Sequence, residues 1–322
     1  MLIDLIVIAA GFGALVWSAD RFVDGAAALA RRIGLSPLII GMTIVSLGTS
    51  APEILVSLVA AATGAGTLAV GNAFGSNIAN IGMVLGITLI ISPILVGRIT
   101  VTKDLPLLLI TVVGCGFLLW DRVLSYLDAC ILIGGLLLFL RRLVARARHP
   151  NTTDEVPEIH DMTALRASVT FVVGLIVLIG ASRALVWSAV NIASSLGISE
   201  LVIGLTIVAV GTSLPELAAA TVSAVKGHAD IAIGAVIGSN MFNLLVVLAI
   251  PGFFGDLQLS EAAVFRDLAM VMLTTIALAG FAWLAFDRKR DTSRLGRRVG
   301  IVFLLMYVAY YSVLILQPNF PS

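Results

Sequence analysis

The stretch "GMTIVSLGTSAPE" at Gly41–Glu53 places a carboxylate inside a long apolar segment. From Ile33 to Gly97, Glu53 is the only Asp, Glu, Lys, Arg or His. At an offset of 163 residues, Gly204–Glu216 reads "GLTIVAVGTSLPE" and is identical at nine of thirteen positions. The same offset places Ala69–Ile81, "AVGNAFGSNIANI", over Ala232–Leu244, "AIGAVIGSNMFNL", with six of thirteen identities. Because one offset serves both pairs, the chain is an internal duplication.

The composition is that of a membrane protein. Of the 322 residues, 59% are hydrophobic and 12% are charged, and the mean hydropathy is +1.09. About 20 apolar residues cross the hydrocarbon core of a bilayer as a helix. We therefore predict ten transmembrane helices, at residues 2–29, 37–63, 68–92, 105–120, 126–142, 165–195, 200–224, 230–252, 266–286 and 298–316.

The duplication divides these ten helices into two units. The expected domains are a first five-helix repeat at 1–142, a cytoplasmic linker at 143–163 and a second five-helix repeat at 164–322. Because five is odd, the second repeat enters the membrane in the inverted orientation. Lys and Arg concentrate in alternate loops, which places the linker in the cytoplasm and both termini outside. We expect an all-α polytopic protein of the cell (plasma or inner) membrane. Inverted repeats with interrupted helices are typical of secondary transporters.

The repeated motif predicts a broken helix that lines a cavity. Pro52 lacks an N–H and clashes with the carbonyl of Gly48, four residues back. A break at membrane depth is tolerated only where the backbone is packed in protein or lines a cavity. An unpaired charge such as that of Glu53 costs about 2.5–3.5 kcal/mol or more at the bilayer centre. Because no Lys or Arg lies near it in the motif helices, a bound cation or a proton is expected to neutralise it.

The helix after each motif adds further oxygen atoms. In the first half, Ser76 and Asn80 follow Asn72 at four-residue spacing and form one polar stripe. The predicted ligand set contains two carboxylates, six hydroxyls and four amides: Glu53, Glu216, Thr49, Ser50, Thr212, Ser213, Ser76, Ser239, Asn77, Asn240, Asn80 and Asn243. Hard oxygen donors suit Ca²⁺ and Na⁺. The absence of Cys and His from this set argues against Zn²⁺ or Cu⁺.

The paired motifs "GTSAPE" with "GSNIAN" and "GTSLPE" with "GSNMFN" resemble the α-repeats of the cation/calcium exchanger superfamily, the sodium/calcium exchangers. The resemblance covers both halves and implies ten helices in two inverted repeats, with the first and sixth helices sliding across a four-helix core. It also implies that the residues named above, apart from Asn243, are ion ligands. Some family members carry an Asp where this chain has Asn243, and potassium-dependent relatives share that Asp-bearing pattern. The neutral Asn80 and Asn243 therefore argue against potassium dependence.

These observations predict a secondary antiporter that exchanges Na⁺ for Ca²⁺ by alternating access. A proton-coupled cation exchanger and a cation channel are the alternatives. A hydrolase is disfavoured because His149, His160 and His228 all fall in loops, away from Ser50 and Ser213. We expect a monomer in the lipid bilayer with Na⁺ and Ca²⁺ as substrates, no cofactor, no enzymatic activity and no nucleic-acid partner. The two carboxylates balance one Ca²⁺ or two Na⁺, whereas the family resemblance implies three Na⁺, so the stoichiometry stays open.

Overall fold

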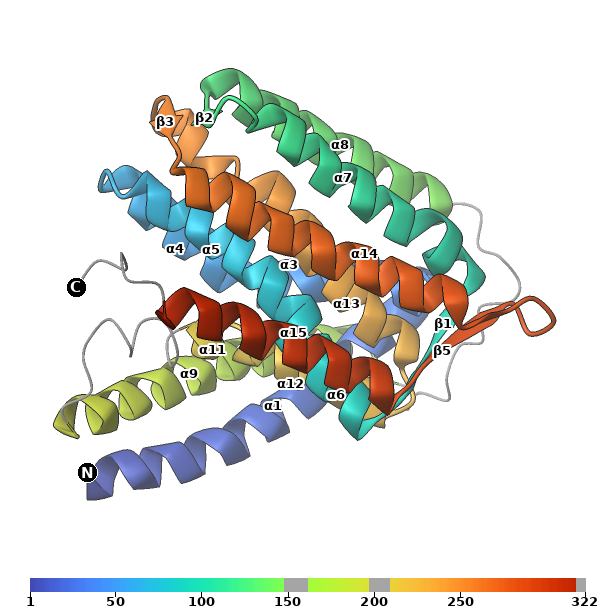
Figure 1. The fold of residues 1–322 in the computed structure, drawn as a ribbon. Coiled ribbons are helices and arrows are strands. Elements are labelled where there is room, and N and C mark those ends of the chain that lie inside the picture. The colour runs from blue at the N-terminus through green and yellow to red at the C-terminus, as the bar shows by residue number, and fades with distance from the viewer. Residues whose placement is uncertain (148–161, 197–208, 317–322) are drawn as a thin grey trace.

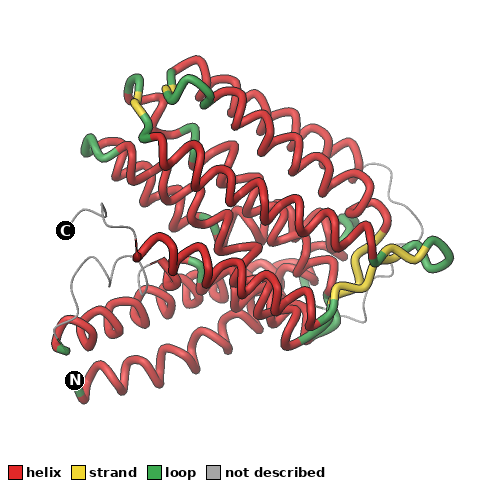
Figure 2. Tube along the Cα trace, in the orientation of Figure 1, coloured by secondary structure: helices red, strands yellow, loops and turns green. Residues whose placement is uncertain are grey.

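A computed structural model describes residues 1–147, 162–196 and 209–316. Long helices make up nearly all of this part of the chain, and short strands occur only at the ends of the helical bundle (Figures 1 and 2). The predicted all-α class is therefore correct for the bulk of the protein. The small strands were not predicted.

The elements of the first half follow one another with short connections. They are α1 (Leu2–Ile33), α2 (Pro37–Ile40), the π-helical segment η1 (Gly41–Val45), α3 (Ser46–Thr49), α4 (Ala51–Ala62), α5 (Gly66–Ala79), the π-helical segment η2 (Asn80–Leu85), α6 (Gly86–Ile91), β1 (Ile94–Gly97), the π-helical segment η3 (Thr100–Asp104), α7 (Leu105–Leu118), β2 (Val123–Leu124) and α8 (Tyr126–Ala147).

The second half has a matching order of elements. They are α9 (Ala164–Ser195), α11 (Ala209–Thr212), α12 (Leu214–Val225), α13 (Ala229–Phe242), the π-helical segment η5 (Asn243–Val247), the 3₁₀ segment η6 (Ile250–Phe254), β3 (Leu257–Gln258), the π-helical segment η7 (Ala263–Asp267), α14 (Leu268–Leu284), β4 (Phe286–Asp287), β5 (Thr292–Leu295) and α15 (Arg297–Leu316).

Within the described residues, seven helices are long and apolar enough to cross a membrane. An eighth span is a bent pair, Pro37–Thr49 and Ala51–Ala62, whose two parts meet at 46°. The predicted span at 200–224 lies partly outside the described residues, and its remainder contains the short apolar helix α12. Helix α8 continues to Ala147, so the first five residues of the predicted linker are helical. The segment 148–161 lies outside the described residues.

Helices α1 and α9 pack along each other at one side of the bundle (Figure 1). Two glycines allow the close approach. A Cβ on Gly174 would lie 2.6 Å from the backbone nitrogen of Phe22, and a Cβ on Gly11 would lie 2.9 Å from the Leu185 side chain. Since Phe22 and Leu185, and likewise Gly11 and Gly174, are 163 residues apart, the two contacts are related by the offset of the sequence repeat.

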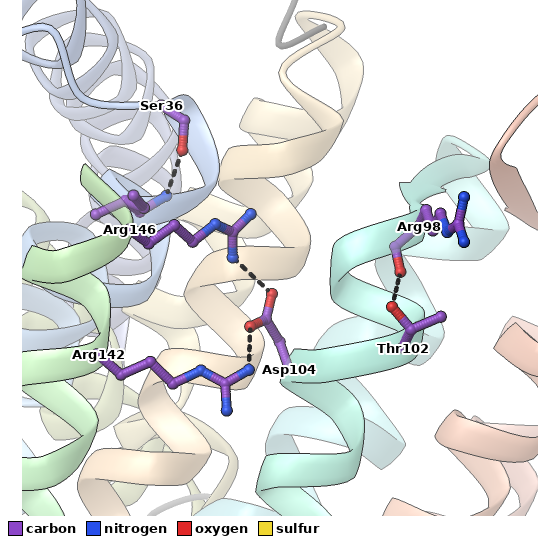
Figure 3. A network of polar contacts seen from close by, with 7 residues as sticks. Ser36, Arg98, Thr102, Asp104, Arg142 and Arg146 are labelled. Carbon is purple, nitrogen blue, oxygen red and sulfur yellow. Dashed lines mark hydrogen bonds and ion pairs between the residues drawn. The ribbon is translucent and has the colours of Figure 1, made fainter. Parts of the chain in front are cut away.

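The connections at one end of the bundle carry an antiparallel sheet and a buried ion-pair network. The sheet has the order β1-β5-β4, with Ile94 opposite Leu295. Nearby, the buried Asp104 lies between two arginines of α8: its carboxylate is 3.0 Å from Arg146 and 4.0 Å from Arg142 (Figure 3). A buried carboxylate is tolerated where cations pair with it, and here the pairing joins η3 to α8.

The opposite end of the bundle carries the N-terminus, the α4–α5 turn and the two-stranded sheet of β2 and β3 (Figure 1). The three-stranded sheet with the Asp104 ion pairs and the two-stranded sheet therefore lie at different ends of the bundle.

Candidate cation-binding site

Both repeated motifs interrupt a helix at the position that the sequence predicts. In the first half, α3 ends at Thr49 and α4 begins at Ala51, with Ser50 between them outside helical geometry. In the second half, α11 ends at Thr212 and α12 begins at Leu214, with Ser213 at the break. A proline stands at the start of each new helix, where its missing N–H costs nothing. The breaks therefore follow from the proline chemistry of the motif.

The two motif carboxylates lie at the starts of these new helices and are buried. Glu53 is 1% exposed and Glu216 is 6% exposed, and each lies in the first turn of its helix. That position places each carboxylate at the positive end of a helix dipole. The Ser50 hydroxyl donates to Glu216 Oε1 at 3.4 Å, so the first motif contacts the carboxylate of the second. Thr49 also interacts with Glu216, and the Glu53 and Glu216 carboxylates lie close enough to repel each other.

Ser76 and Asn77 of α5 and Ser239 and Asn240 of α13 are buried. The Asn80 amide donates to Asn240 Oδ1 at 3.2 Å and thereby joins the two halves a second time. Asn80 and Asn243 each begin a π-helical segment. π-helical turns occur often at functional sites because they re-aim side chains within a helix. The equivalent positions of the two halves therefore share one local distortion.

Several polar atoms of these residues are fully buried and have no hydrogen-bond partner within the described part of the chain. The oxygens are Glu53 Oε2, Glu216 Oε2, Ser213 Oγ, Ser239 Oγ, Asn77 Oδ1 and Asn243 Oδ1. Leaving a buried polar group unsatisfied costs about 1–3 kcal/mol, and more for a charged group. Six such oxygen atoms lie on residues of the one predicted site. They indicate that the site binds a cation, which these oxygens coordinate. Among the described residues no group of three or more His, Cys, Asp or Glu lies together.

Other predicted ligands make hydrogen bonds within their own helix. The Thr49 hydroxyl donates to the Ser46 carbonyl at 3.3 Å, and the Asn77 amide donates to the Ala73 carbonyl at 2.8 Å. The second bond uses the Asn77 nitrogen and leaves its oxygen available. Ser76 is buried, and Thr212 is half-buried beside the second break.

Three polar residues outside the predicted ligand set support the motifs. The Asn72 amide donates to the Glu53 carbonyl and to the Ser57 hydroxyl, both at 3.0 Å. The Ser182 hydroxyl of α9 donates to the carbonyl of Gly211 at 2.8 Å. That carbonyl lies four residues before the motif proline, where the helix cannot supply a donor. Asn72 could have been predicted from the sequence, because it begins the polar stripe with Ser76 and Asn80. Ser182 could not, because a single serine in α9 belongs to no such pattern.

The geometry defines an all-helical membrane protein with a buried, oxygen-lined site at two broken helices. Such a site is typical of transporters that bind hard cations within the membrane. The sequence profile of the sodium/calcium exchanger protein family matches residues 3–144 and 166–316. The chain belongs to this family, and it is a membrane cation/Ca²⁺ exchanger by that membership.

Individual relatives cover nearly the whole chain. It is 42% identical over 321 residues to the putative antiporter CaxA of Alkalimonas amylolytica, covering 98% of this chain and 99% of that protein. It is 27% identical to the sodium/calcium exchanger MaX1 of Methanosarcina acetivorans, covering 97% and 98%. A solved structure of the sodium–calcium exchanger NCX_Mj superposes with a TM-score of 0.83 at 30% identity, covering 98% of this chain and 99% of that one.

Proposed function

We propose that the protein is a secondary antiporter that exchanges Na⁺ for Ca²⁺ across the cell membrane by alternating access. The single observation that carries this proposal is the pair of buried carboxylates, Glu53 and Glu216, each with one oxygen that has no partner within the described residues. Two negative charges among neutral oxygen donors suit one Ca²⁺ or two Na⁺. The two ions then compete for overlapping ligands.

The proposed ligands are the twelve residues predicted from the motifs, with the two carboxylates as the charged pair. Unsatisfied oxygens on Ser213, Ser239, Asn77 and Asn243 support their inclusion. Thr49, Ser50 and Asn80 lie in the same cross-half contacts and would add neutral donors. The names of the relatives MaX1 and NCX_Mj, both sodium/calcium exchangers, support Na⁺ and Ca²⁺ as the substrates.

The proposed architecture is ten transmembrane helices in two inverted five-helix repeats, 1–142 and 164–322, joined by a cytoplasmic linker. Breaks at Ser50 and Ser213 and π-helical turns at Asn80 and Asn243 support the repeat, since each pair is 163 residues apart. Both termini would lie outside the cytoplasm. Since the whole site is built by one chain, we propose that the monomer transports ions without a cofactor.

Flux measurements on proteoliposomes test the proposal. Purified protein is reconstituted, and ⁴⁵Ca²⁺ uptake is followed with an imposed Na⁺ gradient and separately with an imposed pH gradient. Uptake that requires the Na⁺ gradient supports Na⁺ coupling. Uptake driven by the pH gradient without Na⁺ would instead assign proton coupling to the carboxylates, and uptake without any counter-ion gradient would indicate a channel.

A further inference from the structure

Helices α1 and α9 pack closely along each other. Among the described residues, the buried apolar side chains fall into two clusters. The larger cluster joins α5–α8 to α12–α15. The smaller one is centred on α1 and α9, with Phe22, Leu178 and Leu185, and it also takes in side chains of α2, η1, α12 and α13. Two helices that pack closely along each other can move as one unit against the rest of the protein, because the packing between them is kept during such a motion.

A lysine connects this helix pair to the helix of the second motif. Lys226 follows α12 directly, and its amine lies 2.6 Å from Asp20 and 2.6 Å from Asp24, both on α1. The same amine lies 3.4 Å from the Asp20 carbonyl. The Lys226 side chain is only 26% exposed, so these contacts are partly shielded from solvent. We call this cluster of Lys226, Asp20 and Asp24 the Lys226 bridge.

The bridge is present in one half of the repeat only. At the offset of 163 residues, Asp20 corresponds to Arg183, Asp24 to Trp187 and Lys226 to Thr63, so the second copy cannot form. The packing shows the same asymmetry. Helix α1 packs against α12, whereas the equivalent helices α9 and α4, both fully described, have no comparable interface. The helix pair is therefore docked on one broken helix and not on its counterpart.

A cavity lies near the other end of the same helix pair. It has a volume of about 360 Å³ and is lined by apolar residues of the first half of α1, the second half of α9 and the second motif: Ile8, Phe12, Leu185, Val186, Ala189, Val210, Gly211 and Leu214. Ile8 and Phe12 precede Asp20 by two to three helical turns. The interface between the helix pair and the second motif is thus closed at the Lys226 end and hollow towards the opposite end.

We propose that the Lys226 bridge is the gate that closes the cation site towards the Lys226 end of the molecule, and that it must break before ions exchange with that side. The inference rests on the proposed transport function, to which it adds the gating residues. The residues at the 163-residue offset cannot form a second bridge. The arrangement that is closed at the Lys226 end is therefore stabilised by the bridge, whereas the arrangement that is closed at the opposite end is not. Burial and the charge of Lys226 lower the pKa of the neighbouring His228 imidazole, while Asp24 opposes this shift.

Cysteine accessibility tests the gate without measuring transport. In a background with both native cysteines replaced by alanine, Ser223→Cys reports on the closed end, because Ser223 is 1% exposed and lies three residues before Lys226 on α12. Ala189→Cys reports on the cavity at the other end. Each reporter is combined with Lys226→Met and, as a matched control, with Lys103→Met, an exposed lysine outside the bridge. A membrane-impermeant maleimide is applied to either side of the vesicles, with no ion gradient.

Lys226→Met should raise the labelling rate of the Ser223→Cys reporter about threefold to tenfold, as expected from the loss of two partly exposed ion pairs. It should lower labelling of the Ala189→Cys reporter from the opposite side, while Lys103→Met changes neither. Reversing the pair with Lys226→Asp and Asp24→Lys should restore the protection. Unchanged labelling in Lys226→Met, or equal changes in the control, would overturn the gate and leave Na⁺/Ca²⁺ exchange untouched. Failure of Na⁺-driven flux in the parent protein would reject the proposed function instead.

Discussion

Replacing Glu216 with glutamine removes one of the two charges of the site at almost constant shape. A carboxylate and a monovalent cation about 4 Å apart attract each other by about 4 kcal/mol at an effective dielectric constant of about 20. The attraction doubles for Ca²⁺. If desolvation offsets half of each value, the net loss is about 4 kcal/mol for Ca²⁺ and about 2 kcal/mol for Na⁺. These values correspond to affinities that fall about 1,000-fold for Ca²⁺ and about 30-fold for Na⁺.

The structure makes this perturbation specific to the site. Glu216 is 6% exposed, and one of its oxygens accepts a hydrogen bond from Ser50, which glutamine can also accept through its amide oxygen. The matched control is Glu261→Gln, which removes a carboxylate from an exposed position. Both variants are reconstituted, and initial ⁴⁵Ca²⁺ uptake is measured against external Ca²⁺ and against competing Na⁺. Thermal unfolding of the purified proteins in detergent establishes that each variant is folded.

The expected result is loss of Ca²⁺ uptake at Ca²⁺ concentrations that saturate the parent protein. The affinity for Ca²⁺ should fall more than the affinity for Na⁺. Glu53→Gln should behave in the same way, because that carboxylate is equally buried. Uptake close to that of the Glu261→Gln control in either site variant would refute the assignment of the carboxylates. An equal loss of affinity for both ions would refute the charge argument.

Three further predictions follow from the same geometry. Asn243→Asp should add a third charge and raise the Hill coefficient for Na⁺; behaviour like that of the parent at every pH would show that charge at this position does not set the stoichiometry. Ser182→Ala leaves the Gly211 carbonyl without its donor and should cost about 1–3 kcal/mol of stability in a thermal unfolding assay; Ser188→Ala, whose buried hydroxyl has no partner in the described part of the chain, is the control and should cost less. Thr152→Cys should be labelled only from the cytoplasmic side of vesicles, and exclusive labelling from outside would reject the inverted topology.

The sequence predicted the helical class of the fold, seven of the expected spans and the positions of both helix breaks. It did so because each cause is local: apolar runs of membrane length give the spans, and Pro52 and Pro215 cannot continue a helix. The burial of Glu53 and Glu216 was predictable for the same reason, since each stands alone among apolar neighbours. Boundaries were less accurate. Helix α8 extends to Ala147, past the expected start of the linker.

Contacts between distant segments could not be predicted from local patterns. The Ser50–Glu216 and Asn80–Asn240 hydrogen bonds join residues 166 and 160 positions apart, and only the folded chain brings them together. The same holds for Lys226 and its two aspartates, 202 or more residues away. The π-helical turns that begin at Asn80 and Asn243 were also not predicted from the sequence.

Occupancy of the site connects the proposed exchange to the proposed gate. With no cation bound, Glu53 and Glu216 would carry two unbalanced charges at low dielectric, and closing the site around them is costly. In the proposed exchange, one Ca²⁺ or two Na⁺ would cancel these charges, so that the α1–α9 pair would move only when the site is loaded. None of the proposed cation ligands belongs to the Lys226 bridge. The bridge should therefore change the equilibrium between the two arrangements of the α1–α9 pair by the same amount for both ions. The carboxylates should decide whether the protein can change from one arrangement to the other. A protein without the bridge should still exchange Na⁺ for Ca²⁺ with strict coupling but rest in a different conformation. A protein that lacks either carboxylate should lose Ca²⁺ uptake.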